Sequence, residues 1–289
     1  MAERAESRVD PVINALTFDV EDYYHVRAFQ AVIRPEDWNT YEPRVYNNTL
    51  KIIELLAPHG IQATFFVLGW VAEQMPDVVK EIQSAGHEIG SHGYGHQLIY
   101  DQTPDEFAAD LRRSLDVIEG ITGSKVRGFR APSFSVTRGS FWAIEIMRSF
   151  GITYDSSVFP ILHDNYGIPD APRHPYEISK DFWEFPMTTV RIFGQNIPIA
   201  GGAYLRVFPY WLTRWGIRQI NSGGEPAIVY LHPWELDPEH PRIEASALSR
   251  FRHYANLDKT TARLGALCED FKFTSLQGLL QELSPLAIT

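Results

Sequence analysis

Two histidines lie four residues apart in the segment Ser91-His92-Gly93-Tyr94-Gly95-His96. The glycines around them argue against a helix, so the segment is predicted to be the end of a strand that turns into a loop. A tight turn that brings two imidazoles together suits a divalent metal such as zinc. A surface turn with two incidental histidines explains the pattern equally well, because a two-histidine match alone is not specific.

Three carboxylates follow an apolar run near the start of the chain. Residues 14–19 are predicted to form a buried strand that ends in Asp19, with Glu21 and Asp22 directly after it. Carboxylates this close repel one another unless a cation or an arginine lies among them, although a solvated acidic turn is the alternative. Residues two apart in an extended chain share a face. We therefore expect Asp19 and Glu21 to point into one site, and Asp22 to point away unless the chain turns there.

An arginine and a histidine follow two further predicted strands. Arg130 ends the strand at 125–129, and its guanidinium fork suits a carboxylate, so we expect it to orient Asp19 and keep it charged. A purely structural ion pair is the alternative. His232 ends the strand at 226–231 and would be a good general acid beside a metal site, although a histidine there can also be an ordinary hydrogen-bonded polar group.

Two residues beside these strand ends are candidates for substrate contacts. Pro132 is expected to stiffen the turn after Arg130 and to leave the N–H of Ser133 free to point inward. Trp234 suits an apolar or sugar-stacking wall, with core filling as the alternative, which applies equally to Trp183.

Predicted strands and helices alternate along the chain, which favours a mostly parallel sheet, open or closed into a barrel. The expected strands are 14–19, 62–68, 87–90, 125–129, 152–154, 182–188, 196–200 and 226–231, and a long ordered loop is expected at 160–182. The strongest helix signal is the capping box Thr103-Pro104-Asp105-Glu106. In barrels the chemistry lies at the carboxyl ends of the strands, where this chain places Asp19, His92, Arg130, Asp155 and His232. This crowding favours an enzyme.

Composition narrows the class of protein. The chain has 289 residues, 44% of them hydrophobic, which suits one large α/β domain or two small ones. A net charge of -10 disfavours nucleic acid and anionic membranes as partners. The single cysteine, Cys268, excludes an internal disulfide, and no apolar run is long enough to span a bilayer. The charged first dozen residues predict no signal peptide and a cytoplasmic location. The oligomeric state is left open.

The ordered motifs resemble the polysaccharide deacetylases of carbohydrate esterase family four. They are Thr17-Phe18-Asp19, Ser91-His92-x3-His96, Arg130-x-Pro132 and Leu231-His232, and they extend over residues 14–235. The variants Asp19-Val-Glu-Asp22, Tyr230-Leu-His-Pro-Trp-Glu235 and Phe251-Arg-His-Tyr-Ala-Asn256 resemble the subgroup associated with bacterial exopolysaccharide and exosortase loci. The resemblance implies a single distorted (β/α) barrel domain over 1–289 with about seven parallel strands and a helical C-terminal extension at 236–289. It also implies zinc as the usual metal and N-acetylated saccharides as substrates.

The resemblance also implies roles for single residues. Asp19 corresponds to the catalytic base, His92 and His96 to metal ligands, Arg130 to the residue that tethers the base, and His232 to the general acid. The Ser133 N–H corresponds to the oxyanion donor, Leu231 to the wall of the acetate-methyl pocket, and Tyr154-Asp155-Ser156-Ser157 to a supporting motif that brings Tyr154 to the substrate site. Val20 stands where the family has a second aspartate, so the acidic ligand is Glu21 or Asp22, or is absent; face geometry favours Glu21.

The family's aspartate partner of the acid histidine is not identifiable in the sequence. The function predicted is metal-dependent removal of N-acetyl groups from a bacterial polysaccharide or oligosaccharide. The alternatives are a metal-independent allantoinase-like amidohydrolase and a non-catalytic carbohydrate-binding barrel.

Overall fold

A curved, mostly parallel sheet forms the centre of the molecule. The structure is a computed structural model that describes residues 12–163 and 166–283. Within these residues seven parallel strands follow the order β10-β1-β2-β3-β4-β5-β7, which confirms the predicted distorted (β/α) barrel. The strands are β1 (Ile13–Val20), β2 (Thr64–Val67), β3 (Glu88–Ser91), β4 (Gly128–Phe129), β5 (Tyr154–Asp155), β7 (Phe182–Glu184) and β10 (Ile228–Leu231).

The other strands lie at the margins of this sheet. β6 (Tyr176–Ser179) pairs antiparallel with β7, so the prediction of a loop throughout 160–182 was wrong there. β6 alternates apolar and polar residues (Tyr176-Glu-Ile-Ser179), but this four-residue pattern is short, and the pairing with β7 stabilises the strand. β8 (Thr189–Ile192) and β9 (Gln195–Pro198) form a separate hairpin, and β11 (Lys272–Thr274) pairs with the first residues of β1.

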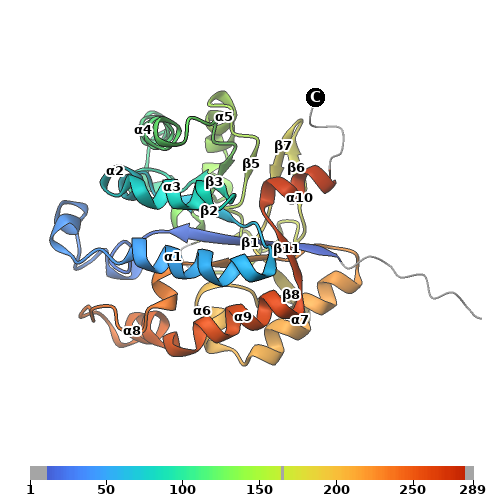
Figure 1. Cartoon of the computed structure of the whole chain (residues 1–289). Coiled ribbons are helices and arrows are strands. Elements are labelled where there is room, and N and C mark those ends of the chain that lie inside the picture. Colours follow the sequence, from blue (N-terminus) through green and yellow to red (C-terminus); the bar gives the residue numbers. More distant parts are fainter. Residues whose placement is uncertain (1–11, 164–165, 284–289) are drawn as a thin grey trace, which may run out of the picture.

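Helices surround the strands on both sides. In Figure 1, β1 crosses the middle of the molecule, with α2 to α5 on one side and α6 to α9 on the other. The helices are α1 (Val45–Leu56), α2 (Gly69–Gln74), α3 (Pro76–Ser84), α4 (Pro104–Thr122), α5 (Trp142–Ser149), α6 (Gly202–Val207), α7 (Tyr210–Ser222), α8 (Ala247–Tyr254), α9 (Thr260–Asp270) and α10 (Leu276–Leu283). The last three confirm the helical C-terminal extension. Among the helices of the described residues, none combines the length and apolarity that a membrane crossing requires.

The start of α4 confirms the capping box. The Thr103 side chain accepts a hydrogen bond from the Glu106 N–H, the Glu106 carboxylate accepts one from the Thr103 N–H, and Pro104 is the first helical residue. Gly123, in the left-handed conformation, ends the helix.

Two apolar clusters hold the sheet. One lies between the strands and the surrounding helices, and the other fills the inside of the barrel. Inside the barrel, the Phe66 ring occupies the space that a Cβ on Gly90 would need, and the Tyr154 ring does the same at Gly128. Leu276 of α10 belongs to this inner cluster and closes it from the C-terminal extension. Because apolar side chains fill the inside of the barrel, polar side chains have room only at the carboxyl ends of the strands.

Candidate active site

Glu21, His92 and His96 form a buried cluster at the carboxyl ends of β1 and β3. One ligand atom from each residue lies within 4.8 Å of the others. The His96 Nε2 is 2.7 Å from the Glu21 Oε2. His96 has a left-handed backbone (φ 51°), which turns the chain so that its ring returns toward His92. Two imidazoles and one carboxylate are a donor set used by catalytic zinc sites.

His92 is held in the state that metal binding requires. Burial lowers the pKa of His92 to about 4, so the ring is neutral near pH 7. Its Nδ1 lies 2.9 Å from the Arg130 carbonyl oxygen, which can only accept a hydrogen bond, so Nδ1 carries the proton. Nε2 therefore keeps its lone pair, and the carbonyl fixes the orientation of the ring.

Glu21 rather than Asp22 completes the cluster. Burial raises the pKa of Glu21, but His96, His232 and His92 together bring it well below its ordinary range, so the carboxylate is charged. Asp22 instead accepts hydrogen bonds from the backbone N–H groups of Arg44 and Val45 at the start of α1. The chain turns after Glu21, and the structure does not bring the predicted Asp22 into the metal cluster.

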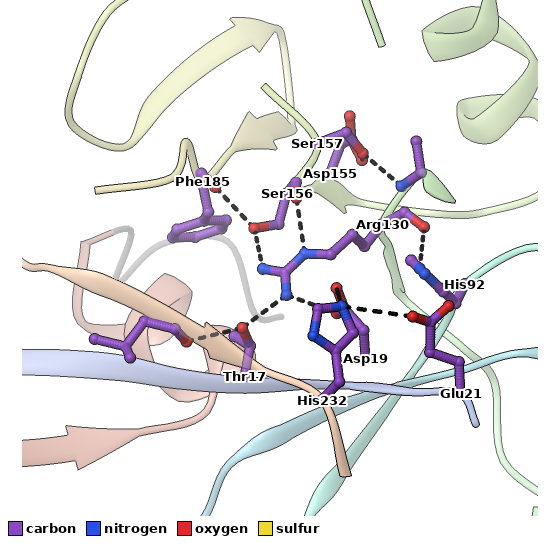
Figure 2. Close-up of polar contacts among 12 residues, drawn as sticks. Thr17, Asp19, Glu21, His92, Arg130, Asp155, Ser156, Ser157, Phe185 and His232 are labelled. Atoms are coloured by element: carbon purple, nitrogen blue, oxygen red, sulfur yellow. Dashed lines mark hydrogen bonds and ion pairs between the residues drawn. The ribbon is translucent and has the colours of Figure 1, made fainter. Parts of the chain in front are cut away.

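Arg130 fixes Asp19 from inside the barrel (Figure 2). Its Nη1 donates to the Asp19 Oδ1 at 2.8 Å and to the Thr17 hydroxyl at 2.7 Å. Its Nε and Nη2 donate to the backbone oxygen and the hydroxyl of Ser156, at 2.9 and 2.8 Å. The guanidinium is fully buried and lies 4.4 Å from the centre of the Phe66 ring. All three guanidinium nitrogens of Arg130 therefore donate hydrogen bonds, which fixes the orientation of the Asp19 carboxylate. The second oxygen of Asp19 faces His232.

His232 has a buried partner that sequence reasoning missed. Its Nδ1 is 2.7 Å from the Glu235 Oε1, and its Nε2 lies 3.8 Å from the Asp19 Oδ2 and 3.6 Å from the Glu21 Oε1. Burial lowers the pKa of His232, but Glu235, Glu21 and Asp19 raise it to about 9. Arg206 donates from Nε to the Glu235 Oε2 at 2.6 Å. The spacing His232-x-x-Glu235 is a capping signal that could have revealed Glu235.

The remaining predicted residues divide into two groups. Ser133 and Trp234 line a cavity of about 440 Å³ together with His232. Ser133 has a left-handed backbone (φ 53°), and the Trp234 ring stacks on His232 with centroids 5.2 Å apart. Leu231 and Tyr154 are not among the residues that line this cavity. Leu231 packs in the cluster between sheet and helices, because neighbouring strand residues face opposite sides, and Tyr154 lies deeper in the barrel with its hydroxyl on Glu88.

Ser156 and Ser157 support the arginine from the next strand. The Ser156 hydroxyl donates to the Phe185 carbonyl oxygen, and the Ser157 hydroxyl accepts from the Ala131 N–H. These contacts agree with the supporting role expected for the Tyr154–Ser157 segment.

Comparison with known proteins identifies the first half of the chain. The polysaccharide deacetylase family matches residues 13–154. This segment is a polysaccharide deacetylase domain. Residues 156–281 match a domain of unknown function, DUF3473, which includes His232 and Glu235.

Curated relatives of the deacetylase domain are similar over about a third of the chain. A peptidoglycan-N-acetylglucosamine deacetylase of Bacillus cereus is 33% identical over 98 residues, which are 34% of this chain and 36% of the relative. A chitooligosaccharide deacetylase of Azorhizobium caulinodans is 34% identical over 85 residues, 29% of this chain and 40% of the relative. The matched segments thus span well under half the length of these relatives.

Solved structures support the fold over nearly the whole chain. A Mycobacterium smegmatis protein assigned to the polysaccharide deacetylases has a TM-score of 0.63 at 21% identity, with 98% of this chain and 94% of that chain covered. An allantoinase has a TM-score of 0.61 at 13% identity, with 96% and 91% covered. Because both fit equally well, the fold does not discriminate between these activities, and the site residues must.

Proposed function

We propose that the chain is a metal-dependent hydrolase that removes N-acetyl groups from a saccharide polymer or oligomer. One observation carries the proposal: a tethered carboxylate, Asp19, and a histidine with a raised pKa, His232, face each other beside the Glu21–His92–His96 cluster. Hydrolysis of an amide by a metal-activated water needs a general base, a general acid and a set of metal ligands close together. The deacetylase names of the relatives support the choice of an N-acetylated saccharide.

Glu21, His92 and His96 would hold a divalent metal, most simply zinc. The neutral His92 with a free Nε2 lone pair, and the charged Glu21, fit such an ion. A metal bound there would lower the pKa of a water and polarise the acetamide carbonyl. Asp22 has no part in this assignment, because its Oδ2 accepts hydrogen bonds from the Arg44 and Val45 N–H groups at the start of α1 and its Oδ1 accepts one from the Tyr23 N–H.

The chain's own residues would move the protons. Asp19, with Oδ1 held by Arg130, would accept a proton from the attacking water at Oδ2. The N–H of Ser133 would donate a hydrogen bond to the oxyanion that forms on the acetyl carbon. His232 would then donate its Nε2 proton to the departing sugar amine, while Glu235 keeps the Nδ1 proton in place. Trp234 would form one wall for the substrate.

We further propose that residues 1–289 form one catalytic unit and that the substrate is an exopolysaccharide. The unit is supported by contacts of His232, from the second half of the chain, with Asp19 and Glu21. The exopolysaccharide is supported by the resemblance of the segments 19–22, 230–235 and 251–256 to one subgroup of the family.

The test is acetate release from a panel of N-acetylated oligosaccharides, including chitin, peptidoglycan and exopolysaccharide fragments. Asp19→Asn and His232→Ala should each lower kcat about 10²–10⁴-fold while circular dichroism stays unchanged. Asp116→Asn, on the exposed side of α4, is the matched control and should keep full activity. Near-normal turnover in Asp19→Asn would refute the role of the base, and saccharide binding without acetate release would favour a binding barrel. Full activity after exhaustive chelation would instead favour a metal-independent amidohydrolase.

A further inference from the structure

The segment Phe251-Arg-His-Tyr-Ala-Asn256 ends α8 and is tied through Arg206 to the partner of the acid histidine. Arg206 is buried, and its Nη1 and Nη2 donate to three backbone carbonyl oxygens at the end of α8, at 2.8–3.0 Å. These oxygens are those of Arg252, His253 and Ala255. A helix leaves its last carbonyl groups without an internal partner, so a cationic side chain suits this position. Because Arg206 also donates from Nε to Glu235, one side chain joins the end of α8 to Glu235.

Asn256 fixes the same junction from the other direction. Its backbone is left-handed (φ 53°), a conformation that asparagine adopts more readily than most residues, and it turns the chain away from α8. Its side-chain Nδ2 donates to the Arg206 carbonyl oxygen at 3.0 Å. The end of α8 therefore has a defined position relative to α6, which carries Arg206. The His253 side chain projects from this anchored end.

The His253 ring belongs to a stack of three rings that includes the acid histidine. It lies on Trp234 with ring centroids 4.1 Å and planes 17° apart, and Trp234 lies on His232 with centroids 5.2 Å and planes 23° apart. Phe29 and His240 meet the His253 ring in T-shaped contacts, at 4.7 and 5.0 Å between centroids. Burial, followed by the neighbouring His240, holds the pKa of His253 well below its ordinary range, so the ring stacks as an uncharged plate.

Two contacts together fix the orientation of the acid histidine. The Glu235 carboxylate at Nδ1 fixes one edge of the imidazole but leaves the tilt of its plane free. The Trp234 ring against its face removes that freedom, so Nε2 points at the space between Asp19 and Glu21. A displacement of about 1 Å in a catalytic group can cost about 10²-fold in rate. The plane of Trp234 depends in turn on the ring behind it, which is that of His253.

We propose that His253 is a positioning residue for the acid histidine: it fixes the Trp234 ring and, through that ring, the tilt of the His232 imidazole. This inference rests on the proposed function, in which His232 protonates the departing sugar amine. An amide nitrogen needs that proton before the C–N bond breaks, whereas the 4-nitrophenolate of an activated aryl ester leaves as the anion. Loss of the His253 ring should therefore slow amide cleavage and spare ester cleavage.

The first experiment compares kcat for acetate release from the fully N-acetylated tetramer of N-acetylglucosamine with kcat for 4-nitrophenyl acetate. His253→Ala, and His253→Leu, which keeps apolar volume but has no flat ring, should lower the tetramer kcat at least about tenfold without changing its KM, and should change the ester kcat by less than about twofold. His253→Phe restores a flat, uncharged ring and should recover most of the loss. Phe251→Leu, at an exposed position of the same segment, is the matched control and should change neither kcat.

A second measurement needs no turnover. NMR of the metal-free protein follows the His232 Nδ1 proton, which lies in the hydrogen bond to Glu235 and is assigned by its loss in His232→Ala. This proton should exchange with water at least about tenfold faster in His253→Ala and His253→Leu, because a ring that is free to tilt opens the hydrogen bond more often. The natural chain, His253→Phe and Phe251→Leu should share the slower rate.

Three results overturn the positioning role. They are equal exchange rates in His253→Leu and Phe251→Leu, a parallel fall of kcat for the tetramer and the ester, and a raised KM with unchanged kcat. The last would mean that His253, which also lines the cavity beside His232, contacts the saccharide instead.

Acetate release by the natural chain reports on the proposed function by itself. Release combined with equal kcat values in His253→Leu and Phe251→Leu means that the positioning role alone fails. Faster proton exchange confined to His253→Ala and His253→Leu supports the positioning role even where no acetate appears.

Discussion

Glu235 lies between His232 and Arg206, and its replacement by glutamine tests how the acid histidine is held. Its Oε1 accepts from the His232 backbone N–H at 3.0 Å and lies 2.7 Å from Nδ1, and its Oε2 accepts from the Arg206 Nε at 2.6 Å. Glutamine keeps one acceptor oxygen but places an NH₂ group where the other oxygen was. One of the two neighbours therefore loses its acceptor. Removing one partner of a buried ion pair costs about 3–5 kcal/mol, because the other charge stays buried.

The raised pKa of His232 gives a second value for how much this contact stabilises the fold. It also shows how that stability depends on pH. Burial lowers this pKa, but Glu235 first, then Glu21 and Asp19, raise it from 6.5 to about 9. At about 1.4 kcal/mol per pH unit, the protonated ring gains about 3 kcal/mol from the fold. Since the folded pKa is the higher one, this stability is fully present below pH 6.5 and is lost as the pH rises through 9. Glu235 has a lowered pKa, so its contribution is present above pH 4.5 and is lost in acid.

The difference between the natural chain and Glu235→Gln should therefore be largest between about pH 4.5 and 6.5. Urea unfolding of chelated protein at pH 5.5 should show a loss of about 3–5 kcal/mol, and a smaller loss at pH 9.5. The kcat for acetate release at pH 7 should fall between tenfold and about 10⁴-fold. Glu239→Gln, exposed four residues later, is the control and should change neither quantity. Equal unfolding free energies and kcat values for the two variants would refute the reasoning.

Other substitutions test three features one at a time: the proposed metal ligands, the buried carboxyl group of Glu184 and the stability of the fold. Glu21→Gln should abolish stoichiometric zinc binding measured by atomic absorption. Asp22→Ala should keep the zinc and lose about 0.5–2 kcal/mol of unfolding free energy, because it removes the acceptor for the backbone N–H groups at the start of α1. Zinc retained by Glu21→Gln contradicts the ligand assignment. Burial and the neighbouring Asp155 raise the pKa of Glu184 well above its usual range, so the folded state binds this proton more tightly and stability falls as the pH rises from 4.5. Glu184→Gln should flatten that fall in urea unfolding between about pH 4.5 and 8; an unchanged slope means that Glu184 is not the group responsible. Thr103→Ala should lower the melting temperature through a cost of about 0.5–2 kcal/mol at α4 and leave kcat unchanged.

The chain's local patterns determined most of the barrel and four members of the site. An apolar run that ends in a polar residue predicts a buried strand whose last side chain lies at the rim, and parallel strands bring their carboxyl ends together. Asp19, His92, Arg130 and His232 could therefore be placed near one another without knowledge of the tertiary structure. β6 was missed because its apolar–polar alternation covers only four residues inside a segment expected to be a loop, and its pairing with β7 stabilises it.

Only the tertiary structure decided between the neighbouring carboxylates Glu21 and Asp22 and supplied Arg206 as the partner of Glu235. Glu21 and Asp22 are adjacent and chemically alike. Only Asp22 is kept out of the site, because its carboxylate accepts hydrogen bonds from backbone N–H groups at the start of α1, 22 and 23 residues further along the chain. Arg206 meets Glu235 across 29 residues of sequence, and no local signal predicts a buried ion pair at that distance. Local patterns specify which face a side chain occupies. Long-range packing specifies which other side chain it meets there, because that depends on how separate elements come together.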